Sequence, residues 1–94
     1  MTAGRVYLDG YLELPADRRA AVLAALPAHI ALTRAEPGCL SFEVAPDPDN
    51  ADRLLVAEIF ADQAAFDAHQ ARARTSAWAD VTAGLPRHYR IRTE

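Results

Sequence analysis

The chain has 94 residues, of which 51% are hydrophobic and 24% are charged, and this balance excludes intrinsic disorder. The 13 acidic and 10 basic side chains leave a net charge of −3, which gives no electrostatic reason to expect binding to nucleic acid or to an anionic membrane. A chain of this length makes a single domain over residues 1–94. It buries so small a share of its surface that we expect a partner subunit to supply more burial.

The cysteine content and the distribution of apolar residues exclude further classes of protein. Cys39 is the single cysteine, so there is no disulfide framework, and no Cys/His cluster has the spacing of a zinc site. No apolar run approaches the roughly 20 residues that span a bilayer. The first residues lead directly into a strand-like pattern, without the apolar region of a secretion signal. We therefore expect a cytoplasmic protein without a metal or a membrane anchor.

The first predicted element is a strand over residues 5–14. Its side chains alternate, with Val6 and Leu8 on one face and Tyr7 and Tyr11 on the other. A period of two with β-branched and aromatic members is typical of a strand that is buried on one face only.

A helix is predicted over residues 16–36. Val22, Leu26 and Ile30 recur every four residues and form an apolar stripe. Pro27 lies inside this stretch, where it removes one backbone hydrogen bond and clashes with the preceding turn. The proline predicts either a kink or two short abutting helices, and the continuous stripe favours the kink.

Two further strands are predicted over residues 39–45 and 53–60. Gly38 follows a proline and ends the preceding helix, because glycine adopts a positive φ without steric cost. The stretch 46–52 between the strands is rich in Pro, Asp and Asn, which indicates a hairpin loop. Glu58 interrupts the second, mostly apolar strand.

The last third of the chain combines helical segments and a strand. Asp62 is a good N-cap for a helix to about Arg72, and Thr75 or Ser76 can cap a second segment. Residues 87–93 alternate as a final strand. The order β-α-β-β-α-β predicts a ferredoxin-like α+β fold, an antiparallel sheet with helices on one face.

Such a sheet leaves its other face uncovered. Tyr7 and Tyr11 would lie on that face together with apolar residues of the strand over 53–60. An exposed apolar patch of this kind usually marks an interface. Two sheets that face each other would close into a barrel, so we expect a symmetric homodimer, a dimeric α+β barrel.

Three stretches of the chain form a recognisable combination. They are EPGCLSFE at residues 36–43, LVAEIFAD at 55–62 and FDAH at 66–69. Their residues and spacing resemble the antibiotic biosynthesis monooxygenase (ABM) family, and the resemblance covers essentially the whole chain. It implies a dimer of ferredoxin-like units, with a pocket between the sheet and the helices of each subunit.

The resemblance also implies an activity. Studied members of the family oxidise phenolic or quinol-like substrates with O₂ and use no metal, flavin or haem. The expected function is therefore cofactor-independent monooxygenation of a small phenolic or quinol-type aromatic substrate by a homodimer. A bound hydroquinone that loses a proton becomes an anion able to reduce O₂ directly. The protein need only bind the ring, accept a proton and exclude water.

His69 is the predicted catalytic residue. On its helix it shares a face with Phe66 that should point at the sheet, where an imidazole can act as the base for a phenol near neutral pH. The alternative is a histidine whose hydrogen bonds are satisfied inside the core. His29 lies on a largely exposed helix, so we predict that it faces solvent. His88 alternates with arginines and is predicted at the surface or at an interface.

The predicted substrate-binding residues are Trp78, Phe66, Phe42 and Glu58. The aromatic rings can flank a planar substrate, although core filling is the favoured role for Trp78 and still more for Phe66 and Phe42. Glu58 is a carboxylate among apolar neighbours, which is costly to bury unless it is paired. It is expected either to take part in catalysis or, more in keeping with its surroundings, to form a structural ion pair with Arg87, Arg90 or Arg92.

The chain departs from two branches of the family. Polyketide-tailoring members surround the phenol with Asn, Trp, Tyr and Arg, whereas the single asparagine here, Asn50, lies in the hairpin loop. The haem-degrading branch relies on an early-strand asparagine, where this chain has Asp9 and Gly10. Three alternatives therefore stay open beside the monooxygenase. They are a non-catalytic dimeric ligand-binding protein, an isomerase and a haem-binding protein on the same dimeric barrel.

Overall fold

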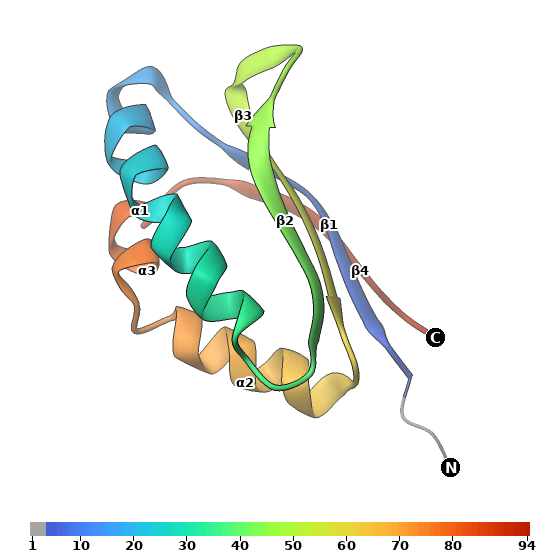
Figure 1. Cartoon of the computed structure of the whole chain (residues 1–94). Helices are drawn as coiled ribbons and strands as arrows, with labels where there is room; N and C mark the ends of the chain where they lie inside the picture. The colour runs from blue at the N-terminus through green and yellow to red at the C-terminus, as the bar shows by residue number, and fades with distance from the viewer. Residues whose placement is uncertain (1–3) are drawn as a thin grey trace.

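The computed structural model describes residues 4–94. Its strands are β1 (Val6–Glu13), β2 (Cys39–Asp47), β3 (Asn50–Phe60) and β4 (Arg87–Thr93), and its helices are α1 (Ala16–Arg34), α2 (Gln63–Ala73) and α3 (Ala77–Val81). The strands form one antiparallel sheet in the order β2-β3-β1-β4, and α1, α2 and α3 lie on the same side of it (Figure 1). The predicted ferredoxin-like α+β fold is confirmed.

The central strand β1 sets which side chains face the helices. Val6 and Leu8 are buried on the helix side, as their alternation with Tyr7 predicts. Leu8 lies opposite Glu58 of β3, and directly opposed residues of neighbouring strands point to the same face of a sheet. This register therefore places the Glu58 carboxylate under the helices.

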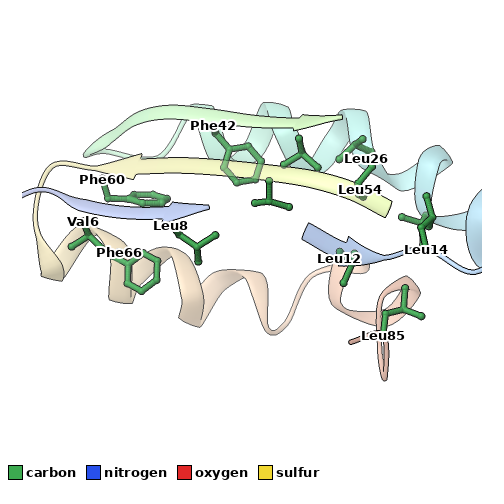
Figure 2. Packing of buried hydrophobic residues seen from close by; sticks show 13 residues of the cluster. Val6, Leu8, Leu12, Leu14, Leu26, Phe42, Leu54, Phe60, Phe66 and Leu85 are labelled. Atoms are coloured by element: carbon green, nitrogen blue, oxygen red, sulfur yellow. The ribbon is translucent and has the colours of Figure 1, made fainter. Parts of the chain in front are cut away.

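The apolar core fills the space between the sheet and the helices. Phe60 and Phe66 pack edge to face at one end of it, with their ring centres 5.7 Å apart, and Leu12 and Leu85 lie at the other end (Figure 2). Phe42 is buried in the part of the core between these two ends (Figure 2). In the part of the chain that the structure describes, no helix is both long and apolar enough to cross a membrane.

Helix α1 is a single helix that continues through Pro27, so the alternative of two short helices is wrong. Its buried residues are Val22, Leu26, His29 and Thr33. These positions follow the period of an α-helix, in which the position after Leu26 on the same face is residue 29. His29 is only 5% exposed, so the prediction that it faces solvent is also wrong.

The turns and caps of the second half are mostly as predicted. The side chain of Asp62 accepts a hydrogen bond from the Ala65 amide at 2.8 Å, and Ser76 caps α3 in the same way. The hairpin between β2 and β3 is tighter than the predicted loop over 46–52. Both strands continue into that stretch, and only Pro48 and Asp49 form the turn.

The sheet face without helices carries aromatic rings that are covered by arginines. The Arg92 guanidinium lies 4.1 Å from the centre of the Tyr7 ring, and Arg53 lies 4.2 Å from that of Tyr11. Leu55 of β3 is 41% exposed on the same face. The face therefore combines cation–π pairs with apolar side chains, and it is more polar than the sequence pattern predicts.

Candidate active site

A cavity of about 360 Å³ lies between the sheet and the helices. Leu8 of β1 and Trp78 of α3 form apolar parts of the cavity wall. The titratable part of the lining consists of His29, Glu58, His69, Arg74, Arg87 and Tyr89. Cavities of this size, mostly apolar with a few convergent polar groups, are typical of sites for small organic molecules.

His69 is held by a chain of polar contacts that begins in α1. Its Nδ1 lies 2.9 Å from Oε1 of Glu36, which belongs to the turn between α1 and β2. The second carboxylate oxygen of Glu36 accepts a hydrogen bond from Arg72 Nε. Arg72 in turn donates to the Thr33 hydroxyl at 3.0 Å. The Glu36 carboxylate is therefore held in place by Arg72, and it holds the imidazole of His69 in one orientation.

This contact decides which nitrogen of His69 carries the proton. A carboxylate only accepts hydrogen bonds, so Nδ1 is the protonated nitrogen and Nε2 keeps its lone pair. Burial lowers the pKa of His69, while the charge of Glu36 and its hydrogen bond oppose that effect. The ring is 3% exposed and stacks on Phe60 with the ring centres 5.0 Å apart. His69 is thus a rigid, neutral proton acceptor at the cavity wall.

Glu58 is the second carboxylate of the site. Its Oε1 lies 3.9 Å from Nε2 of His69, and burial raises its pKa to about 7. The expected ion pair with an arginine is not found within residues 4–94. Arg90 and Arg92 contact side chains on the opposite face of the sheet, and Arg87 donates to a threonine hydroxyl at 2.8 Å.

The predicted aromatic residues occupy two different environments. Trp78 lines the cavity and stacks on His29, with ring centres 4.6 Å apart and planes within 5°. Phe42 lies in the core behind the cavity, where its ring contacts those of His29 and His69. Phe66 packs on Phe60 and attaches α2 to the sheet. Phe42 and Phe66 therefore have packing positions in this chain, whereas Trp78 and Glu58 have lining positions.

Comparison with known proteins identifies the family of the chain. The family model described as antibiotic biosynthesis monooxygenase matches residues 5–81. The chain belongs to the antibiotic biosynthesis monooxygenase family. The match runs from β1 to the end of α3, so it contains Glu36, Glu58, His69 and Trp78. None of the curated protein sequences matches the chain significantly.

Solved structures share the fold over nearly the full length. A candidate antibiotic biosynthesis monooxygenase from Nitrosomonas europaea is 23% identical, with a TM-score of 0.80 and coverage of 94% of this chain and 95% of that one. Rv0793 from Mycobacterium tuberculosis is 24% identical, with a TM-score of 0.74 and coverage of 94% and 92%. SO0527 from Shewanella oneidensis is 26% identical, with a TM-score of 0.71 and coverage of 100% and 91%.

Two residues that line the cavity, His29 and Tyr89, were not among the predicted site residues, nor was Glu36, which holds His69 from outside the lining. His29 could have been found from its spacing of seven residues after Val22, which places both on one helix face. Tyr89 alternates with exposed arginines, and its position opposite Gly10 depends on the pairing of β4 with β1. Glu36 belongs to the family-like turn, but its contact with His69 arises from the packing of that turn on α2.

The arrangement suits proton removal from a small hydroxylated ring. His69 offers a lone pair, Glu36 stabilises the charge that follows protonation, and Leu8 and Trp78 offer apolar surface to the ring. In residues 4–94 no group of three or more His, Cys, Asp or Glu side chains is arranged to hold a metal ion.

Proposed function

We propose that this ABM-family protein is a cofactor-independent monooxygenase that oxidises a small phenolic or quinol-type aromatic substrate with O₂. The observation that carries the proposal is the state of His69. Its Nδ1 is bound to Glu36, so its Nε2 is a proton acceptor in a cavity large enough for an aromatic ring. Leu8 and Trp78 supply apolar surface for the faces of that ring.

The first step is proton transfer from the substrate hydroxyl to Nε2 of His69. The imidazolium that forms is stabilised by the Glu36 carboxylate, which Arg72 holds in place. The product of this step is an aromatic oxyanion. Its negative charge is spread over the ring, which makes the ring carbons electron-rich.

The second stage joins one oxygen atom to the ring. The anion transfers one electron to O₂, and the resulting superoxide and ring radical combine to form a carbon–oxygen bond. The ring carbon then loses its hydrogen as a proton, the O–O bond breaks, and the outer oxygen leaves as water. A hydroquinone thereby loses two hydrogens and gains one oxygen, and the second atom of O₂ becomes water. Glu58, with a pKa of about 7, is a suitable proton donor for the departing oxygen.

The working unit in this proposal is a homodimer formed through the sheet face without helices. Support comes from the exposure of Leu55 on that face and from the small burial that a chain of 94 residues achieves alone. Two copies that bury this face would close a barrel and leave each cavity under its own helices.

An oxygen electrode tests the activity. With a panel of small hydroquinones, the wild type should consume O₂, and His69→Ala should reduce the rate by about 10²-fold because the base is lost. Gln63→Ala is the matched control, since Gln63 is exposed on α2, the helix that carries His69, and its side chain pairs with Asp67 outside the cavity. It should retain the wild-type rate.

Other outcomes would contradict the proposal in recognisable ways. Turnover that continues without O₂ would indicate an isomerase or another non-oxidative enzyme. A ligand that binds and stabilises the fold without conversion would indicate a binding protein. A Soret band on titration with haemin would indicate haem binding, and a wild-type rate for His69→Ala would remove that residue from the mechanism.

A further inference from the structure

The imidazole of His29 has an unusual hydrogen-bonding state. It is 5% exposed and lies in the cavity wall, and its Nδ1 has no hydrogen-bond partner within residues 4–94. Buried polar side-chain atoms are nearly always hydrogen-bonded, and each exception calls for an explanation. A histidine in this state, next to the proposed base, is a candidate for contact with the substrate.

The orientation and charge of the His29 ring are both fixed by its surroundings. The ring stacks on Trp78 with the planes within 5°, and Phe42 contacts it edge-on with the ring centres 5.4 Å apart. Burial lowers its pKa to about 4, and the charges of His69 and Arg72 act in the same direction. At neutral pH His29 therefore carries a single proton on a ring that cannot turn freely.

The single proton belongs on Nε2. Nδ1 is buried without a partner, and an N–H group there would be an unsatisfied donor. Buried orphan donors are rarer than under-used acceptors, so the lone pair rather than the proton stays at Nδ1. Because the ring lines the cavity, Nε2–H is then the donor that faces it. His69 presents the complementary group, a lone pair on its own Nε2.

We propose that Nε2–H of His29 donates a hydrogen bond to the substrate oxygen that His69 deprotonates, so that the two histidines together bind a phenolate. Their ring centres are 6.2 Å apart. An oxygen that is hydrogen-bonded to a ring nitrogen lies roughly 4 Å from the centre of that ring, so at this separation one oxygen between the two rings can bond to both. The inference rests on the proposed phenolic substrate class and narrows it to phenols that bind as oxyanions through one free hydroxyl.

A neutral imidazole suits this task. It cannot surrender its proton to the oxyanion as easily as an imidazolium, and it is already oriented before the charge develops. Triosephosphate isomerase offers a precedent, because a neutral histidine with a lowered pKa polarises the substrate carbonyl there. The cavity is also lined by Arg74 and Arg87, whose positive charges favour binding of an anion. Glu58 lines it as well, and its carboxyl group is compatible with a bound anion only when that carboxyl group is protonated.

The pKa of a bound phenol measures this hydrogen bond directly. The probe is 4-nitrophenol, whose anion is coloured, and it is titrated against the wild type, His29→Phe, His29→Gln and the control Leu32→Phe. His29→Phe keeps a ring against Trp78 but has no donor, so the pKa of the bound phenol should rise by about one unit. His29→Gln restores an N–H donor and should bring the pKa back toward the wild-type value. Leu32→Phe changes an exposed residue of the same helix and should leave the pKa unchanged.

A bound-phenol pKa that is the same in His29→Phe and the wild type would overturn the inference, as would failure of the wild type to bind 4-nitrophenol at millimolar concentration. His29→Leu gives the same comparison in case His29→Phe does not fold. The readout involves no O₂. If the pKa of the bound phenol depends on His29 but the protein consumes no O₂, this inference is supported and the proposed function is contradicted. If the protein consumes O₂ but the pKa does not depend on His29, the proposed function is supported and this inference is contradicted.

Discussion

Burial favours the uncharged form of each of the titratable side chains His29, Glu58 and His69 at the cavity. It lowers the pKa of both histidines and raises that of the carboxyl group. Near pH 7 the histidines are neutral and Glu58 is about half protonated. In the proposed function, the phenol enters this site uncharged and becomes an oxyanion only after it transfers its proton to His69.

The pKa of Glu58 predicts a pH-dependent penalty on stability. The carboxyl group has a pKa of about 7 in the folded protein and an ordinary value of 4.5. Below pH 4.5 it is protonated in both states, and between 4.5 and 7 the unfolded state loses its proton first, so stability falls as the pH rises. Glu58→Gln cannot ionise. It should therefore match the wild type at pH 4.5 and exceed its free energy of unfolding by about 3 kcal/mol at pH 8.

Urea denaturation at the two pH values measures this difference. Glu43→Gln on β2 is a suitable control, because Glu43 is exposed and its pairing with Arg34 at the surface contributes little. A Glu58→Gln variant that is no more stable than the wild type at pH 8 would show that burial does not raise the pKa of the Glu58 carboxyl group.

The turn between α1 and β2 positions His69, the proposed base. Gly38 has φ +86°, and a Cβ atom there would lie 2.6 Å from Cβ of Ala65 in α2. The close approach of turn and helix is what brings Glu36 within 2.9 Å of His69. A glycine at this position therefore serves the geometry of the site as well as the end of α1.

Gly38→Ala should destabilise the protein through two effects. Positive φ costs a non-glycine residue about 1–2 kcal/mol, and overpacking against Ala65 adds about 1–3 kcal/mol. Gly84→Ala is the matched control, since Gly84 has φ +78° but no atom within 4 Å of an added Cβ. Thermal denaturation should therefore show a clearly larger loss for Gly38→Ala, and equal losses would mean that the contact with α2 is unimportant.

Elements defined by local signals could be predicted from the sequence, and those set by distant neighbours could not. Asp62 acts as a helix cap because the amide that it binds lies three residues away. The hairpin was predicted too long because pairing between β2 and β3 overrides the turn-forming composition of 46–52. The burial of His29 was not predicted because the buried face of the helix was assigned from its apolar residues. That criterion selects Ile30 after Leu26 and does not include a histidine.

The same distinction applies to the site. His69 and Glu58 stand out in the sequence as polar residues in apolar surroundings, and both line the cavity. The neighbour of Glu58 proved to be His69 of α2 rather than an arginine of β4. That contact depends on the crossing of a helix over the sheet, which no local pattern encodes.

At the scale of the whole fold, residues 4–94 place no helix on one face of the sheet, and dimer formation through that face can be tested by substitution. Leu55→Asp places a charge at the centre of the proposed interface and should reduce the sedimenting mass from that of two chains to one. Leu32→Asp is the control, because Leu32 is 55% exposed on α1, on the helix side of the sheet. A wild type that sediments as a single chain at micromolar concentration would contradict the dimer.

The most direct test of the proposed chemistry is to turn over a hydroquinone under ¹⁸O₂ and determine the mass of the product and of the water formed. One labelled atom is expected in the oxidised ring and one in water, with both signals lost in His69→Ala. An oxidised product that carries no label, formed at the same rate by His69→Ala, would contradict both the monooxygenase and the role of its base.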